Sequence, residues 1–244
     1  MADQANGAPD RYDDLRAVVI NCTLKASPGP SHTDTLLQVP EQIFRARKVA
    51  VEHVRAVDLD IAPGVQPDMT RHGFASDDWP ALFEKVRAAD ILIIGTPIWL
   101  GARSSVCSRV IERLYAMSAM LNDRGQFLYY GKVGGCIVTG NEDGVKHVAR
   151  GVLYSLQHLG YTIPPQAEAG WIGEAGPGPS FGDEGENGAR IGFDNVFTQR
   201  SATFMAWNLL HLARMLKSAG GIPTWGNQQS AWDKGERFGY KDPE

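Results

Sequence analysis

The residues best suited to chemistry gather in three segments that are expected to be loops, and each segment follows a run of apolar residues. The first segment, residues 23–33, combines hydroxyl side chains with one lysine directly before a predicted helix. Backbone N–H groups at a helix start, together with hydroxyl donors and a cation, bind anions such as phosphate. The candidate ligands are Thr23, Lys25, Ser31, His32 and Thr33. Taken alone, the segment fits equally well a solvated turn in which a hydroxyl caps the helix.

The second segment places a tryptophan and two aliphatic residues between a proline and a glycine. Its candidate residues are Thr96, Pro97, Ile98, Trp99, Leu100 and Gly101. Apolar side chains with nearby backbone N–H and C=O groups suit a flat aromatic ligand that has polar ring edges. The alternative is that the tryptophan only covers the edge of a sheet.

The third segment is rich in glycine, which allows the backbone to approach a ligand closely. Its candidate residues are Thr139, Gly140, Asn141, Asp143 and Gly144. A plain strand-to-helix turn, with Asn141 or Asp143 as the helix cap, explains the segment equally well in isolation.

The elements around these segments alternate between strand and helix patterns, which predicts an α/β fold with an open parallel sheet. Strands are predicted at 17–22, 49–57, 91–95 and 133–139, and a fifth begins at Tyr161. The predicted helices include 76–89, a helix after 104, and 145–159. Pro40 should either kink the first helix or delay its regular part. Five strands fit the doubly wound order 2-1-3-4-5, which brings the three segments together at the carboxyl ends of their strands.

The domain organisation predicted from the sequence is one domain with two appendages. Residues 1–14 are expected to be a flexible arm, residues 15–218 the domain, and residues 219–244 a polar tail. Within the domain, residues 173–197 form a long loop, whose acidic part is interpreted as solvated surface. A C-terminal helix, residues 198–218, is apolar almost all round and should be buried on several sides.

The composition excludes several classes of protein. The net charge is −4 (24 Lys and Arg against 28 Asp and Glu), whereas nucleic-acid-binding domains are usually basic. No apolar run is long enough to insert into a membrane, and the start of the chain does not resemble a secretory signal. Three cysteines fit a reducing compartment, so a cytoplasmic protein is expected. The six histidines lack paired ligand spacing, and no metal site is predicted.

Familiar catalytic and nucleotide motifs are absent from the sequence. It contains no G-x-G-x-x-G dinucleotide motif, no G-x-x-x-x-G-K-[ST] P-loop and no G-x-S-x-G nucleophile motif. The first predicted strand ends in Asn21-Cys22-Thr23, which lacks the acids of a phospho-receiver domain.

The run from Thr96 to Gly101, followed by Ser104-Ser105 and by Val110-Ile111-Glu112-Arg113-Leu114, resembles the T-P-x-Y/W-x-G/S … F-x-D-R signature of flavodoxin-like NADPH-dependent FMN reductases. The first segment resembles the S-x-R-x(n)-S/G-N-T phosphate loop of that family, with Lys25 in place of Arg and His32 in place of Asn. The third segment resembles a flavin loop. The similarity covers about residues 17–170, and residues 173–233 resemble an extension found in one bacterial branch.

This resemblance implies a flavodoxin-like fold, FMN as the cofactor and NAD(P)H as the co-substrate. Electrons would pass to a quinone, a flavin or a similar small molecule, and no protein nucleophile is needed because the flavin carries the chemistry. The alternatives are a flavodoxin-type electron carrier without enzymatic activity and a flavin-free scaffold. The resemblance also implies a homodimer or homotetramer.

Overall fold

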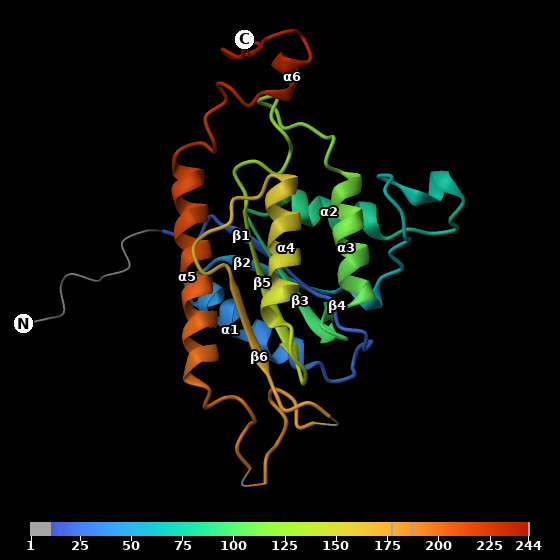
Figure 1. Ribbon diagram of the computed structural model, residues 1–244, viewed down its shortest axis with the longest axis vertical. Helices are drawn as coiled ribbons and strands as arrows, with labels where there is room; N and C mark the ends of the chain where they lie inside the picture. The colour runs from blue at the N-terminus through green and yellow to red at the C-terminus, as the bar shows by residue number, and fades with distance from the viewer. Residues whose placement is uncertain (1–10, 177, 187, 244) are drawn as a thin grey trace, which may run out of the picture.

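The computed structural model describes residues 11–176, 178–186 and 188–243. A parallel sheet has the strand order β2-β1-β3-β5-β6 (Figure 1), so the predicted order 2-1-3-4-5 is confirmed. A short antiparallel strand, β4, is added at the end of β3. The strands are β1 Arg16–Asn21, β2 Ala50–Arg55, β3 Ile91–Trp99, β4 Ala102–Arg103, β5 Val133–Gly140 and β6 Glu168–Ile172.

Helices cover both faces of this sheet because both sets of alternating strand residues are apolar. In β1, Val18 and Ile20 belong to one buried cluster, whereas Ala17 and Val19 belong to the other. The first cluster packs under α2, α3 and α4, and the second under α1 and α5 (Figure 1). The long helices are α1 His32–Ala46, α2 Trp79–Ala88, α3 Ser105–Ala116, α4 Val145–Leu159 and α5 Val196–Ser218. The short ones are η1 Ala56–Asp58, η2 Met69–His72 and α6 Gln229–Trp232.

The predicted start of the last strand is wrong. Tyr161 is buried, but it stacks on Tyr129 with ring centroids 5.0 Å apart, and only Thr162 makes an isolated bridge to the sheet. Two prolines follow and cannot donate ladder hydrogen bonds, so the strand forms later, as β6.

Two other boundaries differ from the expectation. Strand β3 continues to Trp99 because Thr96 and Pro97 still pair with β5, so part of the expected loop is a strand. Helix α1 begins at His32 and runs through a buried Pro40, so the alternative of a later start is wrong.

Helix α5 is buried on one face rather than on several sides. Met205, Leu209 and Leu210 are fully buried against the sheet, whereas the side chain of Phe204 is 46% exposed. The segment that contains α6 lies at one end of the molecule, and the loop after β6 lies at the opposite end (Figure 1). Gln126, which is buried, holds the tail by donating to the carbonyl groups of Ile222 and Pro223.

The expected N-terminal arm lies mostly outside the described residues, which begin at Arg11. Where the chain is described, Tyr12 is 2% exposed and its hydroxyl lies 2.9 Å from Nδ1 of His211 on α5. Tyr12 therefore packs into the domain, although it lies within the predicted flexible arm, residues 1–14.

Arg113, the arginine of the F-x-D-R-like signature, lies in α3 and has a structural role. Its guanidinium is buried and donates to Asp77 at 2.6 Å and to the carbonyl oxygens of Gln66 and Pro67. It therefore fastens the segment between β2 and α2 onto the domain. Removing one partner of a buried ion pair of this kind typically costs about 3–5 kcal/mol.

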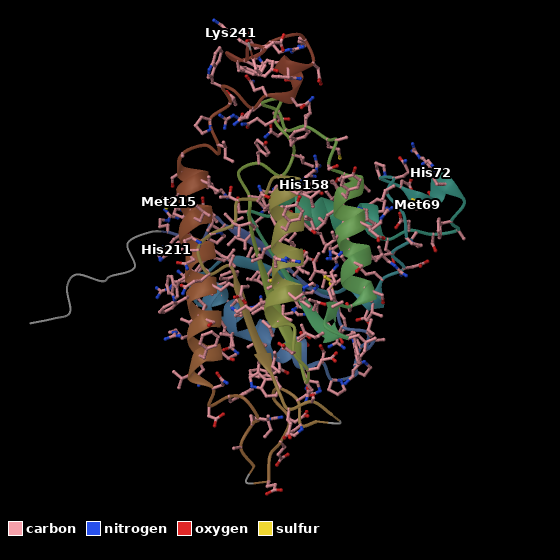
Figure 2. All side chains as sticks on the ribbon, in the orientation of Figure 1. Met69, His72, His158, His211, Met215 and Lys241 are labelled. Atoms are coloured by element: carbon pink, nitrogen blue, oxygen red, sulfur yellow. The ribbon has the colours of Figure 1, made fainter. Side chains whose placement is uncertain are left out.

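No group of three or more His, Cys, Asp or Glu residues is arranged to hold a metal ion within the described part of the chain. Figure 2 places His72, His158 and His211 on three different elements. Among the same residues, no helix is both long and apolar enough to cross a bilayer.

One histidine of the edge strand β2, His53, contacts two carboxylates of α1. His53 lies with Nε2 3.0 Å from Asp34 and Nδ1 2.5 Å from Glu41. Hydrogen bonds from the imidazole to Asp34 and then to Glu41 raise the pKa of His53 to about 9. The pKa of Asp34 is lowered, chiefly by its bond to His53. The protonated histidine therefore stabilises the fold at neutral pH.

We predict that this stabilisation declines with rising pH. It is complete below the ordinary histidine pKa of about 6.5 and is lost as the pH rises through about 9. Replacing His53→Gln should lower the free energy of unfolding by about 1–2 kcal/mol at pH 6, after allowance for solvent screening, and by much less at pH 10. Urea unfolding across this range measures the difference. In an Asp34→Asn/Glu41→Gln background the pH-dependent difference should vanish, and its persistence there would contradict the assignment.

Candidate functional site

A cavity of about 530 Å³ lies at the carboxyl ends of β1, β3 and β5, where the loops after these strands meet. The structure brings most of the predicted site residues to its lining: Thr23, Lys25, Ser31, His32, Thr33, Pro97, Ile98, Trp99, Leu100, Thr139, Gly140 and Asn141. The volume is within the usual range of about 300–1,000 Å³ for small-ligand sites.

Four predicted residues are absent from this lining. Thr96 is fully buried, and its hydroxyl accepts a hydrogen bond from the Ser104 amide. It therefore stabilises the second loop without lining the cavity. Gly101 and Gly144 lie where two loops nearly touch, because a Cβ on Gly144 would come within 3.1 Å of the Gly101 Cα. Asp143 accepts from the Gly144 amide at 2.7 Å and lines a neighbouring cavity.

The first loop has the features of a phosphate cradle. Ser31 caps α1 by accepting from the Asp34 amide, and its oxygen also accepts from Nδ2 of Asn21 at 3.2 Å. Both of these bonds use the oxygen, so the hydroxyl hydrogen is left to donate to a ligand. The amides of His32 and Thr33 are among those that a helix leaves without an intrahelical partner. Lys25 adds a cation that has no carboxylate partner among the described residues.

Thr33 connects the first loop to the third. Its hydroxyl lies 2.7 Å from the hydroxyl of Thr139, and both side chains are buried. One of the two hydroxyls donates to the other, so the pair keeps one hydrogen for a further acceptor. The two loops are therefore held at a fixed separation across the strand between them.

The end of the edge strand β2 and the following turn η1 support the first loop from outside the cavity. Arg55 donates to the carbonyl oxygen of Gly29 at 2.7 Å and to Asp34 at 3.2 Å. Asp58 accepts from the amide of Ser27 at 2.8 Å and from its hydroxyl at 2.6 Å, and these bonds lower the pKa of Asp58. Neither Arg55 nor Asp58 lines the cavity, so both act by holding the loop that does.

The second and third loops form an apolar slot beside this cradle. The side chains of Trp99 and Leu100 are 54% and 94% exposed at the cavity, which is unusual for large apolar groups. Gly140 packs closely against Ile98, because a Cβ at position 140 would lie 2.9 Å from the Cβ of Ile98. Glu142 accepts from the Leu100 amide at 2.6 Å and fixes one loop against the other.

Sequence reasoning missed several residues that line the cavity: Leu24, Glu142, Ala175, Gly176, Gly178, Ser180 and Phe181. Leu24 and Glu142 lie within the predicted segments and could have been included with their neighbours. The other five come from the long acidic loop, where no periodic pattern signals contact with the site. Asp183 of that loop is not plain solvated surface, since it accepts from the Ser180 amide at 2.7 Å.

Two predicted ligands turn out to contact this long loop. Nδ1 of His32 lies 3.1 Å from the carbonyl oxygen of Phe181. Because a carbonyl can only accept, this bond requires the proton on Nδ1. Nδ2 of Asn141 donates to the Pro179 carbonyl at 2.8 Å, and Oδ1 of Asn141 accepts from the Ser180 hydroxyl at 2.9 Å.

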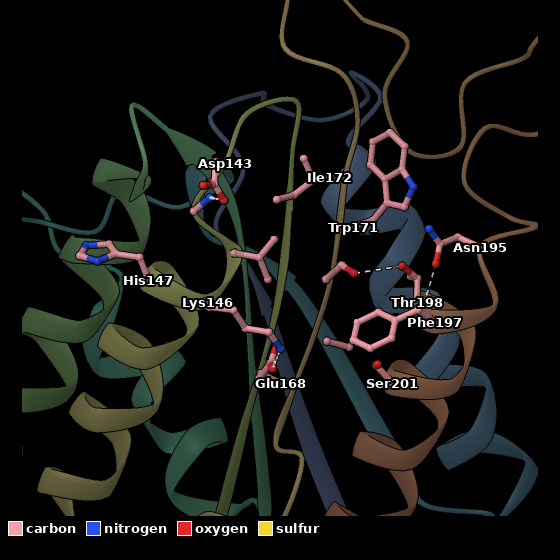
Figure 3. Close-up of a pocket in the computed structure, with 14 residues that line it drawn as sticks. Asp143, Lys146, His147, Glu168, Trp171, Ile172, Asn195, Phe197, Thr198 and Ser201 are labelled. Carbon is pink, nitrogen blue, oxygen red and sulfur yellow. Dashed lines mark hydrogen bonds and ion pairs between the residues drawn. The ribbon is translucent and has the colours of Figure 1, made fainter.

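A second cavity, of about 490 Å³, lies beside the edge strand β6 between α4 and α5 (Figure 3). Lys146 forms an ion pair with Glu168 there, and Thr198 donates to the Gly170 carbonyl. This cavity has no contribution from residues 23–33 or 96–101. It therefore lacks both the phosphate cradle and the apolar slot.

Comparison with known proteins identifies the family. The family described as NADPH-dependent FMN reductase matches residues 15–172. The 8-demethyl-8-aminoriboflavin-5'-phosphate synthase of Streptomyces davaonensis is 39% identical over 208 residues, which are 83% of this chain and 79% of that protein. The chain belongs to the NADPH-dependent FMN reductase family and has a flavodoxin-like fold. The predicted family and cofactors, FMN with NAD(P)H, are confirmed.

Solved structures agree with this assignment. The crystal structure of RosB with the bound intermediate 8-demethyl-8-formylriboflavin-5'-phosphate has a TM-score of 0.78 at 34% identity, covering 94% of this chain and 91% of that one. FerB, an NAD(P)H:(acceptor) oxidoreductase from Paracoccus denitrificans, has a TM-score of 0.52 at 14% identity, covering 80% and 97% of the two chains, and shares the fold.

One further relative is longer than this chain. The divalent metal cation transporter MntH of Mycobacterium bovis is 60% identical over 224 residues, which are 91% of this chain. The chain spans about a third (32%) of the length of that protein.

The residues of the main cavity fit FMN. Helix amides, the Ser31 hydroxyl and Lys25 match the demands of a phosphate group. The exposed Trp99 and Leu100 side chains match an apolar ring, and Gly140 lines the same cavity without a side chain. The FMN phosphate and ring can therefore be held by two adjoining parts of one cavity.

We predict that Arg55 affects binding of the phosphate but not of the ring. Arg55→Gln frees the loop around Gly29, so the Kd for FMN should rise about tenfold, whereas the Kd for riboflavin, which lacks the phosphate, should stay the same. Arg55→Lys keeps the charge but loses the forked geometry and should be intermediate. Fluorescence titration with both flavins measures the split, and the exposed Arg71→Gln is the matched control. An equal loss for both flavins would contradict a role confined to the phosphate loop.

Proposed function

We propose that this protein uses FMN to take a hydride from NAD(P)H and pass electrons to a quinone, a free flavin or a similar small acceptor. The observation that carries this proposal is the convergence of a phosphate cradle and an apolar slot in the cavity of about 530 Å³. FMN, when bound, supplies the redox chemistry itself, so the reaction requires no nucleophile–base pair from the protein.

In this proposal, the protein binds and orients the flavin and limits the access of water. The hydroxyls of Thr23, Ser31 and Thr33, the Lys25 ammonium and the first amides of α1 hold the phosphate. Ile98, Trp99 and the backbone of 139–144 flank the ring. One face of the ring has to remain open, because NAD(P)H and the acceptor both require contact with it in turn. Alternate use of one face predicts ping-pong kinetics.

A second candidate function is chemistry on the flavin itself. The specific observation that favours it is the similarity to the aminoriboflavin phosphate synthase and to RosB. The alignment with RosB extends over 94% of this chain, beyond the residues 15–172 matched by the family. In this alternative a flavin 5'-phosphate occupies the same cavity as a substrate.

The assembly is a separate proposal. We infer a homodimer or homotetramer, supported by the large apolar side chains left on the surface of α5 and the tail. Phe197 is 56% exposed, Phe204 46% and Trp225 75%.

The test of the proposed function is anaerobic stopped-flow reduction of the FMN-loaded protein by NADPH and by NADH. At least one should bleach the flavin absorbance faster than it does with free FMN, and steady-state oxidation should follow when a quinone is added. A bound flavin that is reduced no faster than free FMN would contradict the reductase proposal and favour the electron carrier. Mass spectrometry of the recovered flavin separates the second candidate, because a substrate changes mass and a cofactor does not.

A further inference from the structure

The second flavin loop is a two-residue hairpin turn. Trp99 pairs with Ala102 in antiparallel register, so Leu100 and Gly101 form the turn between β3 and β4. The φ angles of Leu100 and Gly101 are +50° and +73°. Positive φ at both central residues is the pattern of a type I′ turn, for which Asn-Gly and Asp-Gly are the preferred pairs. A leucine at the first position of this turn therefore departs from the local preference.

The left-handed conformation of Leu100 has a support outside the turn. A side chain disfavours this conformation, and burial does not offset the cost, because Leu100 is 94% exposed. The carboxylate of Glu142 accepts from the Leu100 amide at 2.6 Å. Strained backbone of this kind persists where the surrounding structure enforces it, and it clusters at functional sites. The contact between Leu100 and Glu142 therefore invites a functional explanation.

The charge of Glu142 is unpaired at the flavin cavity. Of the described residues that line this cavity, Glu142 is the only Asp or Glu, and Lys25 is the only Lys or Arg. Within the described part of the chain, no cation forms an ion pair with Glu142, and Lys146, four positions further on, pairs with Glu168 instead. The negative charge of Glu142 is therefore not neutralised by a neighbouring side chain.

Glu142 lies at the apolar slot rather than at the phosphate cradle. Its carboxylate contacts the amide of Leu100, and the side chains of Leu100 and Trp99 form the slot. Lys25, by contrast, belongs to the first loop, where the phosphate is expected. The ring of FMN is thus the part of the cofactor that the Glu142 carboxylate faces.

A negative charge at the slot opposes reduction of the ring. A hydride carries two electrons and one proton, so the ring gains one negative charge when it accepts a hydride. An unpaired carboxylate repels this added charge, and the repulsion is stronger where water is excluded. Reduced FMN should therefore bind less tightly than it would beside a neutral side chain, and weaker binding of the reduced form lowers the reduction potential.

We propose that Glu142 lowers the reduction potential of bound FMN through its charge, and that the Leu100 amide holds the carboxylate where it acts. The strained turn then has a function, because its left-handed conformation directs this amide to Glu142. A lower potential makes the reduced flavin a stronger electron donor. The inference rests on the proposed placement of the ring in the slot, but not on the identity of the hydride donor or of the acceptor.

The test measures the midpoint potential of protein-bound FMN by anaerobic spectroelectrochemical titration, which needs neither NAD(P)H nor an acceptor. Glu142→Gln removes the charge but keeps an oxygen that can accept from the Leu100 amide. Glu142→Asp keeps the charge on a shorter side chain. Glu174→Gln is the matched control, because it removes the same charge from an exposed residue that does not line the cavity. Fluorescence titration gives the Kd of each variant for oxidised FMN.

Glu142→Gln should strengthen the binding of reduced FMN about tenfold relative to oxidised FMN, which raises the two-electron potential by about 30 mV. Glu142→Asp should stay close to the wild-type potential. Glu174→Gln should shift the potential far less than Glu142→Gln does, because water and salt screen an exposed charge.

Three results would overturn the proposal. An unchanged potential in Glu142→Gln shows that the charge has no effect, and an equal rise in Glu142→Asp assigns the effect to the hydrogen bond instead. Loss of FMN binding in Glu142→Gln makes Glu142 a binding residue rather than one that sets the potential. A wild-type protein that binds FMN but is not reduced by NADPH or NADH contradicts the proposed function alone, because the potentials are measured without either nucleotide.

Discussion

The parallel pairing of β1, β3 and β5 is the constraint on which the site depends. Asn21, the last residue of β1, is opposite Gly95, and Gly95 is opposite Ile137, so the carboxyl ends of the three strands lie at one edge of the sheet, with β3 and β5 continuing beyond the end of β1 to Trp99 and Gly140. The loops that follow them must then meet, although they are far apart in the sequence. Buried apolar side chains on both faces hold this register, since a shift of one residue would turn each strand's side chains to the opposite face.

Short polar contacts hold these loops at fixed positions around the cavity. The Ser104 hydroxyl donates to the carbonyl oxygen of Cys22 at 2.7 Å, and the hydroxyls of Thr33 and Thr139 pair across the strand ends. Arg55 holds the first loop from outside the cavity, and residues 178–183 bind both the first loop, through His32, and the third loop, through Asn141. These contacts hold the loops relative to one another, which reduces the ordering that flavin binding requires and so favours affinity.

The sequence predicted the strand order and most of the cavity lining because both follow from local patterns. Apolar runs such as residues 91–94 mark buried strands, and the polar residues after them mark the loops. The position of β6 was missed because its sequence, Glu168 to Ile172, lacks a β-branched run and contains a glycine. The contribution of residues 178–183 was missed because the contacts with His32 and Asn141 join positions that are 149 and 38 residues apart in the sequence, respectively. Arg55 could not be assigned because it acts through backbone carbonyls, which carry no sequence signature.

Binding of the FMN phosphate by the first loop is tested most directly by titrating one combined variant with FMN. Lys25→Ala, Ser31→Ala and Thr33→Ala together remove one charge and two hydroxyls, each worth about 0.5–1.5 kcal/mol or more toward a charged acceptor. FMN affinity, measured by quenching of flavin fluorescence, should fall at least about tenfold while the protein stays folded by circular dichroism. Unchanged FMN affinity in the folded triple variant would contradict the account.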